Sequence, residues 1–198
     1  LNMLNKHSKR IQIQQYITKD SEFEILGASF GEGNHLIPCV VDKIRQSPIN
    51  VGNTSYAFVT PKIEKYVDVT KLQHYLDKLN YVGLYSIEFI RKDNDIYFLE
   101  INLRNDGMGY VSTPLGVNLP YSIYQHFYKC SIEDMLGKRI TSEGILFSES
   151  GELLNVKNGD LSAGKWLVDY LSSDVKLYWN FKDIKPCLLY TSPSPRDG

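Results

Sequence analysis

Two glutamates, Glu88 and Glu100, have the type and spacing that could carry chemistry in this chain. They lie on two β-rich runs separated by a turn signal at residues 93–95. A three-residue loop would place Glu88 directly opposite Glu100, with Asn102 beside Glu100 on the same face, because strand side chains alternate. Like charges opposed across strands destabilise a sheet unless a cation neutralises them. Since carboxylate and amide oxygens suit Mg²⁺ or Mn²⁺, the pattern predicts a divalent metal site.

This prediction depends on the register of the hairpin. A three-residue loop pairs Lys92 with Ile96, whereas a loop of two or four residues would move Glu100 to the other face. In the predicted register the opposite face carries an apolar set suited to a core: Tyr85, Ile87, Phe89, Tyr97, Leu99, Ile101 and Leu103. The alternative interpretation is a solvated acidic face whose glutamates splay apart.

Length and composition exclude several classes of protein. The chain has 198 residues, which is enough for one sizeable core or two small lobes. Its 22 basic and 23 acidic residues give a net charge of −1, so no electrostatic footprint for nucleic acid is present. No apolar run approaches the ~18 residues that span a membrane. Three distant cysteines without a CxxC pair favour reduced thiols and a cytoplasmic protein.

The apolar periodicity predicts the elements that would position the glutamates. Strands are expected at 11–17, 22–30, 35–43, 143–150 and 175–179, helices at 69–80, 119–130 and 165–171, and a long glycine-bearing loop at 105–118. A further loop is expected around Pro48 and Gly52, and Asp68 or Thr70 could cap the first helix. Strands mixed with single helices predict an α+β fold, with helices packed on an antiparallel sheet.

Both ends differ from those of a complete protein. The chain starts at Leu1 without an initiator methionine, inside a polar segment. Residues 187–198 change abruptly to a composition rich in serine and proline, and they resemble a translated sequencing-library adapter. We therefore expect them to be a non-native tail. An ordinary Pro-rich disordered tail is the alternative. Either interpretation predicts a fragment.

The hairpin pattern is part of a wider family resemblance. The sequence lacks a GxSxG elbow, an HExxH motif and a P-loop. Glu88 followed by Glu100-Ile-Asn102-Leu-Arg104, and then 115–120 (Leu-Gly-Val-Asn-Leu-Pro), resembles the C-terminal half of the ATP-grasp fold. Residues 14–23 are similar to that family's hinge strand and ribose-binding acid, and 42–55 resembles carboxylate–amine ligase members in particular. The resemblance covers roughly residues 10–186.

The resemblance implies ATP and Mg²⁺ as cofactors, with Mn²⁺ possible. Glu88, Glu100 and Asn102 would hold one or two metal ions that bridge the ATP phosphates. Arg104 would stabilise phosphoryl oxygens or an acyl-phosphate intermediate, a role suited to a permanently charged fork.

The same resemblance implies a nucleotide site. Tyr16 and Ile17 would offer backbone groups to the adenine edge, and Glu22 would accept the ribose hydroxyls. Lys43 or Arg45 could touch phosphates or substrate, or could end a solvated strand. Phe98, predicted on the face of the glutamates, could floor the adenine pocket or simply pack.

The implied activity is an ATP-dependent ligase that joins a small-molecule carboxylate to an amine. Residues 1–139 would form the C-terminal ATP-grasp lobe and 140–186 an extension of it, while the other lobe would lie upstream of Leu1; the isolated chain is then expected to be inactive. Ser86 stands where relatives of D-alanine ligase place an arginine, which disfavours that substrate. Two alternatives remain open: a non-catalytic nucleotide- or metal-binding module, and a metal-dependent hydrolase with Asp106 as a third carboxylate.

Overall fold

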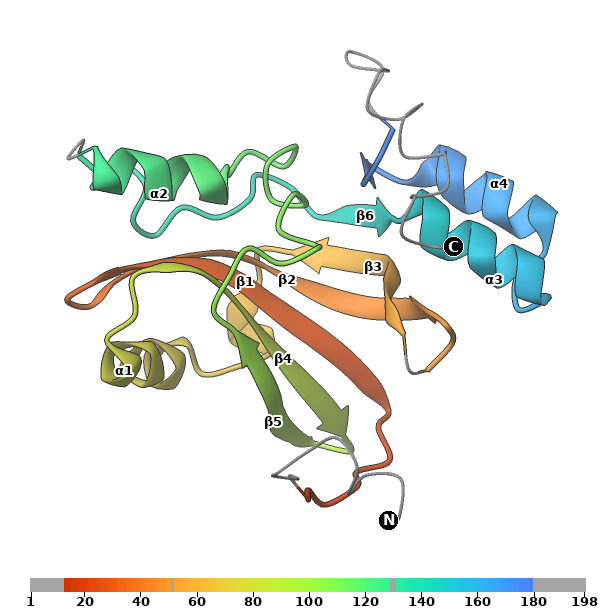
Figure 1. Cartoon of the computed structure of the whole chain (residues 1–198), viewed down its shortest axis with the longest axis horizontal. Coiled ribbons are helices and arrows are strands. Elements are labelled where there is room, and N and C mark those ends of the chain that lie inside the picture. The colour runs from red at the N-terminus through yellow and green to blue at the C-terminus, as the bar shows by residue number, and fades with distance from the viewer. Residues whose placement is uncertain (1–12, 51, 129–130, 180–198) are drawn as a thin grey trace, which may run out of the picture.

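A single sheet organises the chain, as the computed structural model shows for residues 13–50, 52–128 and 131–179 (Figure 1). Within these residues the sheet has seven strands in the order β5-β4-β1-β2-β3-β6-β7. All neighbours are antiparallel except β6 and β7. The strands are β1 (Ser21–Gly31), β2 (Asn34–Ser47), β3 (Asn53–Thr60), β4 (Gly83–Lys92), β5 (Asp95–Asn102), β6 (Gly144–Phe147) and β7 (Val175–Lys176). The predicted α+β fold class is confirmed.

In the part of the chain that the structure describes, four α-helices flank this sheet: α1 (Val69–Leu79), α2 (Leu119–Phe127), α3 (Glu149–Asn158) and α4 (Ala163–Ser172). In Figure 1, α1 lies on the opposite side of the sheet from α2, and α3 and α4 gather beyond β3 and β6. Side chains cap three of them at the N-terminus: Asp68 caps α1, Asn118 caps α2 and Ser162 caps α4. No helix within the described ranges is long and apolar enough to cross a membrane.

Each face of the sheet has its own apolar core. The core under α1 contains Phe23, Ile25, Ile37, Val40, Ile63, Leu72, Leu76, Tyr85, Ile87 and Phe89. The other core lies beneath the 105–118 loop and α2, and includes Leu26, Ala28, Phe30, Leu36, Val41, Val111 and Leu119. On this second face β1 is apolar only from Leu26 onwards, because Glu22 and Glu24 occupy the same face at its start. One end of that face is therefore polar.

Most of the predicted elements form, and three differences are informative. The strand predicted at 11–17 is wrong for its described part, since residues 13–17 are not in a strand and Tyr16 is 87% exposed. Strand β3 forms where a loop was expected to continue. Helix α3 begins at Glu149, inside the strand predicted at 143–150; its buried side chains are the polar Glu152 and Asn155, so it lacks the apolar periodicity that marks most helices.

The hairpin register was predicted correctly at the glutamates but for the wrong reason. The loop has two residues, because Lys92 pairs with Asp95 rather than Ile96. Such a loop would pair Glu88 with Leu99, but a β-bulge between Glu88 and Phe89 shifts the register by one, and Glu88 pairs with Glu100. From Glu88 towards the start of β4 the predicted pairing is therefore confirmed.

The bulge also corrects the predicted faces near the hairpin turn. Phe98 pairs with Phe89 and, with Ile96, joins the apolar face beside α1. Tyr97 pairs with Ile90 instead of joining that face, and Leu99 lines the polar face. The turn and the bulge compensate one another, which is why the two glutamates still meet.

Candidate functional site

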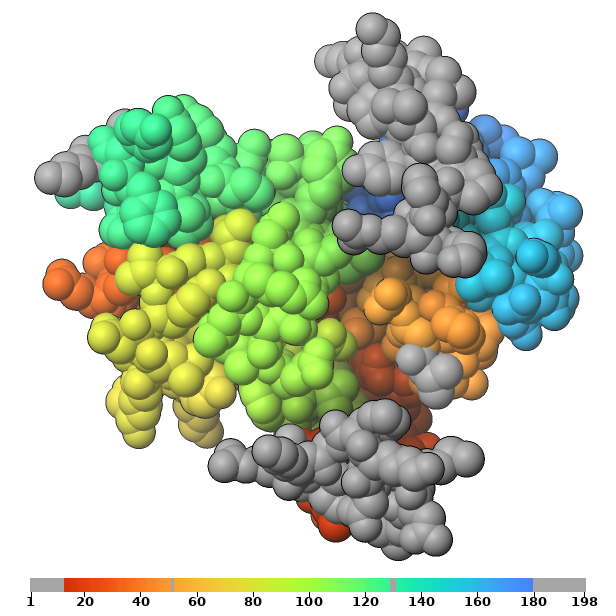
Figure 2. Space-filling view, viewed as in Figure 1, coloured from red at the N-terminus to blue at the C-terminus, as the bar shows by residue number. Residues whose placement is uncertain are grey.

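The polar end of the sheet is the floor of a cleft of about 830 Å³. Its floor carries Glu22 and Glu24 from β1, Lys43 from β2, Glu88 from β4, and Glu100 and Asn102 from β5. One wall is the segment from Arg104 to Met108, and the other combines the β2–β3 turn, the start of α3 and residues 177–178. In Figure 2 the recess opens between the light-green loop and the orange β2–β3 segment. The cleft therefore joins distant parts of the chain.

Cross-strand pairing places these floor residues in adjacent rows. Glu22 pairs with Lys43 across β1 and β2, and Glu24 pairs with Glu88 across β1 and β4. Because Glu88 also pairs with Glu100 across β4 and β5, three glutamates form a row across the sheet. Such a row needs a nearby cation.

Lys43 supplies a cation to this row. Its side chain is 6% exposed, and its Nζ donates a hydrogen bond to Glu88 Oε2 and lies 3.5 Å from Glu22 Oε2. Burial would lower the pKa of Lys43, but the hydrogen bond and charge of Glu88, with the charges of Glu24 and Glu22, outweigh it and raise the pKa. Lys43 is therefore charged at neutral pH, and its charge offsets part of the negative charge of the glutamate row.

Glu22 is fixed at one end of the cleft. Its carboxylate accepts hydrogen bonds from Lys19 Nζ at 2.6 Å and from Gln46 Nε2 at 2.9 Å. Because Gln46 also donates to the Gly52 carbonyl at 2.9 Å, this contact ties β1 to the β2–β3 turn. The predicted ribose-binding acid thus lines the cleft with its carboxylate held in place.

Glu24 is a cleft residue that the sequence analysis missed. It is 2% exposed, and its Oε1 atom has no hydrogen-bond partner among the described residues. Burial, with the charges of Asp106 and Glu88, raises the pKa of Glu24 to about 8 against the opposing charge of Lys43. The strand alternation around it was a usable signal, because it places Glu24 on the same face as Glu22.

Glu24 should make folding stability fall as pH rises. The folded state holds the proton more tightly than the unfolded chain, whose glutamate has a pKa of 4.5, so stability is lost between about pH 4.5 and 8. This single group predicts a loss of about 3 kcal/mol from pH 5 to pH 8. Glu24→Gln should flatten that dependence and stabilise the protein at pH 8, measured by urea unfolding at both pH values. An equally steep fall in the variant would contradict the assignment.

The predicted metal ligands are neighbours on the floor of the cleft. Asn102 Nδ2 donates to Glu100 Oε1 at 3.2 Å, and Arg104 Nη2 donates to Asn102 Oδ1 at 3.4 Å. Across the described ranges no group of three or more His, Cys, Asp or Glu side chains is arranged to hold a metal ion. The candidate set instead has two carboxylates and one amide, all hard oxygen donors, and this chemistry fits Mg²⁺ or Mn²⁺.

Arg104 and Asp106 form the wall beside these ligands. The Arg104 side chain is 62% exposed, and its Nη1 lies 3.6 Å from Asp106 Oδ2. Asp106 is held in turn by the backbone N–H of Met108 at 2.9 Å and by the buried hydroxyl of Ser86 at 3.3 Å. An exposed guanidinium thus lines the cleft from this loop.

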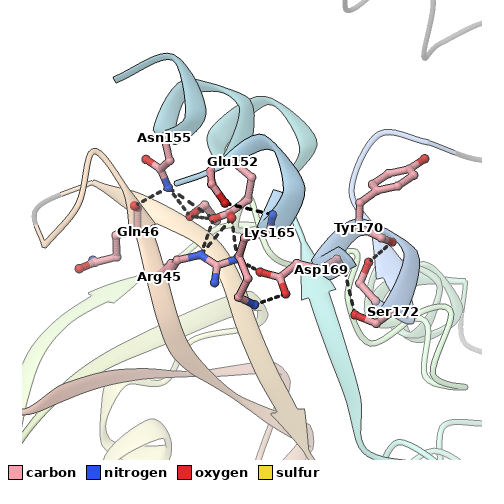
Figure 3. A network of polar contacts seen from close by, with 11 residues as sticks. Arg45, Gln46, Glu152, Asn155, Lys165, Asp169, Tyr170 and Ser172 are labelled. Atoms are coloured by element: carbon pink, nitrogen blue, oxygen red, sulfur yellow. Dashed lines mark hydrogen bonds and ion pairs between the residues drawn. The ribbon is translucent and has the colours of Figure 1, made fainter. Parts of the chain in front are cut away.

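Four predicted nucleotide residues lie outside the cleft. Tyr16 and Ile17 precede β1 and do not line it. Arg45 extends from β2 towards α3 and α4 and pairs with Glu152 and Asp169 (Figure 3). The prediction that Phe98 faces the glutamates is wrong: its ring lies 5.9 Å from that of Tyr75 on the α1 face. The bulge in β5 is the physical reason, because it turns Phe98 away from the cleft.

Comparisons with known proteins agree with this architecture. No family model matches the chain. The large chain of carbamoyl phosphate synthase from Saccharolobus islandicus (strain L.S.2.15 / Lassen #1) is 25% identical over 114 residues, which is 55% of this chain and 11% of that protein. The C-terminal section of the Methanopyrus kandleri enzyme is 26% identical over 115 residues, which is 55% of this chain and 21% of that protein.

Solved structures share the fold at low sequence identity. The N5-carboxyaminoimidazole ribonucleotide synthetase of Thermotoga maritima superposes with a TM-score of 0.51 and 16% identity, over 67% of this chain and 34% of that chain. The phosphoribosylaminoimidazole carboxylase ATPase subunit of Aquifex aeolicus gives 0.52 and 13%, over 66% and 40%. The chain is a distant relative of the ATP-grasp superfamily.

This ATP-grasp relative spans well under half the length of each of these proteins. Its cleft combines the sequence-predicted residues Glu22, Lys43, Glu88, Glu100, Asn102 and Arg104 with residues that the sequence analysis did not select: Glu24, Ser47, Ser148, Ser150 and Gly151. The second set comes largely from the start of α3, a helix that the apolar pattern did not reveal.

Proposed function

We propose that this chain is the metal- and phosphate-binding part of an ATP- and Mg²⁺-dependent ligase that joins a carboxylate to an amine. One observation carries the proposal: Glu88 and Glu100 are paired across a bulged hairpin with Asn102 beside them, in a cleft that also holds Lys43 and Arg104. The carbamoyl phosphate synthase relative supports it through its name and sequence similarity, and the carboxyaminoimidazole ribonucleotide synthetase through its name and shared fold.

Each cleft residue has a role in this proposal. Glu88, Glu100 and Asn102 hold Mg²⁺, for which Mn²⁺ can substitute; when bound, the ion neutralises phosphate charge. The Arg104 side chain is long and exposed enough for its guanidinium group to donate hydrogen bonds to phosphoryl oxygens, and Lys43 adds a second positive charge.

The nucleotide base and sugar would lie beside Glu22. Its carboxylate is the proposed acceptor for the ribose hydroxyls, and the backbone groups of Tyr16 and Ile17, just before β1, are the proposed partners of adenine. The geometry of Arg45 does not favour direct contact with nucleotide, since Glu152 and Asp169 occupy its guanidinium.

The reaction would proceed in two transfers. A substrate carboxylate oxygen attacks the γ-phosphorus of ATP, ADP leaves, and an acyl phosphate forms. The amine nitrogen then attacks the acyl carbon, inorganic phosphate leaves, and the nitrogen loses a proton. Because phosphoryl transfer is accelerated mainly by positioning and charge neutralisation, a cleft of metal ligands and cations suits it better than a single acid–base pair.

The direct test is the metal dependence of nucleotide binding. A non-hydrolysable ATP analogue, titrated calorimetrically into the protein, should bind with Mg²⁺ present and at least tenfold more weakly after chelation. Without a bridging ion the carboxylates repel the phosphates, so removal of Mg²⁺ has to weaken binding at the proposed site. Equal affinity with and without Mg²⁺ would therefore contradict the proposal.

Lys43 should affect metal and nucleotide in opposite directions. In Lys43→Met, Glu88 loses its cation, so Mn²⁺ without nucleotide should bind about tenfold more tightly. The Mg²⁺-bound ATP analogue should bind more weakly, because one positive charge near the phosphates is gone. Calorimetry of both ligands measures this, with the exposed Lys138→Met as the control. Parallel changes in both affinities would exclude the competition between Lys43 and the metal.

A further inference from the structure

The cleft has two chemically different ends. All the ionisable side chains that line it, apart from Tyr178, lie on the sheet floor or on the Arg104–Met108 wall: Glu22, Glu24, Lys43, Glu88, Arg104, Asp106 and Glu100. Among the described residues, the end near α3 is lined by Ser47, Asn53, Thr54, Ser148, Ser150, Gly151, Leu154 and Leu177, which carry no charge. This end must recognise something other than a metal ion.

The N-terminus of α3 opens into this uncharged end. In an α-helix the first amides have no carbonyl partner within the helix, and they carry a partial positive charge. In α3 the N-cap residue is Ser148, whose side chain makes no capping hydrogen bond, and the first intrahelical bond runs from Glu152 N to Ser148 O at 2.9 Å. The amides of residues 149–151 therefore keep their donor capacity, and Ser150 and Gly151 line the cleft.

Two hydroxyls at this position also lack partners among the described residues. Ser148 is 6% exposed and lines the cleft, and Ser47 Oγ is fully buried without a hydrogen bond. Both lie close to Gly151, because a Cβ built on that glycine would be 3.3 Å from Ser148 Oγ and 3.4 Å from Ser47 Cβ. An unsatisfied buried donor is costly, so Ser47 Oγ beside the uncapped hydroxyl of Ser148 indicates a ligand that accepts hydrogen bonds.

The two acids in the first turn of α3 have partners outside the cleft. Glu149 accepts backbone hydrogen bonds from Tyr178 at 3.1 Å and Trp179 at 2.7 Å. Glu152 is fully buried against Arg45. Neither carboxylate lines the cleft, so the helix end keeps its attraction for an anion.

We propose that the N-terminus of α3 binds a carboxylate group of the ligase's small-molecule substrate, an inference that rests on the proposed function. The acceptor oxygens take hydrogen bonds from the amides of 150 and 151 and from the hydroxyls of Ser148 and Ser47. Leu154 and Leu177 line the same end and contact the apolar part of a short carboxylic or amino acid. This carboxylate is therefore not the one that is phosphorylated, because the metal-bound phosphates occupy the other end of the same cleft, where the reacting group must lie.

The test is a titration of the protein with succinate, followed by amide NMR. Succinate should cause saturable shifts at Ser150 and Gly151, and the uncharged succinamide should not. The amides at the start of α4, where Ser162 already caps Lys165 N, are the internal control. Ser148→Ala should weaken succinate binding at least about tenfold, the loss expected for one hydrogen bond to a charged group.

Ser150→Asp separates this site from a purely structural role of the helix end. An acid in the first turn favours the helix, so the variant should unfold at an equal or higher temperature. It should nevertheless bind succinate at least tenfold more weakly, because the new carboxylate repels the anion. Gly164→Asp, at the equivalent place in α4, should leave succinate binding unchanged.

The outcomes also separate this inference from the proposed function. Glu88→Gln/Glu100→Gln should leave the succinate shifts intact, because they need no metal. If succinate causes no saturable shift at Ser150 and Gly151 in the folded protein, or if Ser150→Asp binds it equally well, the α3 site is excluded, whatever the nucleotide result. Shifts centred on Lys43 and Arg104 would also exclude it and would place the anion at the metal end.

Discussion

Replacing Arg45 with methionine is expected to lower the free energy of unfolding by about 3–5 kcal/mol, because removing one member of a buried ion pair strands its partners. Arg45 Nη2 lies 2.6 Å from Glu152 Oε2 and 2.7 Å from Asp169 Oδ2 (Figure 3). Glu152 is fully buried and Asp169 is 2% exposed. Burial would raise the pKa of Asp169, but hydrogen bonds from Lys165 and Arg45 outweigh it and lower the pKa.

The loss should come from stranded charge rather than from lost packing. Arg45→Met/Glu152→Gln/Asp169→Asn removes the charges with little change of shape, and it should recover most of the stability lost in the single variant. Lys71→Met, which breaks an exposed ion pair with Asp68, should cost under about 1 kcal/mol. Urea unfolding measures all three variants. A cost below about 1 kcal/mol for Arg45→Met would show that the network contributes little to joining α3 and α4 to the sheet.

The second large effect is expected at the hairpin. Glu88→Gln/Glu100→Gln should weaken Mg²⁺-dependent binding of an ATP analogue by at least about a hundredfold, since even second-shell changes at metal sites cost 10- to 100-fold. The fold should persist, because the substitutions keep the shape, remove like charges that face each other across β4 and β5, and leave Lys43 Nζ 3.5 Å from Glu22 Oε2. Calorimetry measures the binding, and thermal unfolding checks the fold.

A matched control changes the same net charge elsewhere. Glu133→Gln/Asp160→Asn neutralises two exposed acids outside the cleft and should leave nucleotide binding unchanged. If both double variants bind like the parent protein, the hairpin does not hold the metal. If both weaken binding equally, the effect is one of overall charge rather than of a site.

The hairpin shows what strand patterns can and cannot predict. The prediction that Glu88 pairs with Glu100, with Asn102 on the same face, rested on alternation and on a three-residue loop, and it holds only because a bulge offsets the shorter loop. The loop length was wrong, because the turn residues 93–95 favour a tight turn of either length. Beside the bulge, Phe98 packs against Tyr75 and Phe89, which are far from it in sequence or on another strand. Local patterns therefore predicted the pairing but not the face of Phe98.

Other residues could be assigned only once the topology was known. Arg45 is close in sequence to the cleft residues Lys43 and Gln46, but its partners Glu152 and Asp169 lie more than a hundred residues later. Those partners are on helices whose packing no local pattern encodes. The start of α3 enters the cleft because β6 pairs with β3, a contact between distant segments. Glu24 is the opposite case: alternation along β1 already placed it beside Glu22, so a stricter use of that pattern would have included it.

The most direct test of the central claim is to locate Mn²⁺ in its complex with ATP by paramagnetic broadening of amide NMR signals. If the hairpin glutamates hold the metal, signals around Glu88, Glu100 and Asn102 should broaden first, followed by those around Lys43 and Glu22 across the sheet. Signals of α1, on the opposite face, should remain sharp. Broadening centred instead on the exposed acids of the hairpin turn, Asp93 and Asp95, or spread evenly over the acidic surface, would contradict the account.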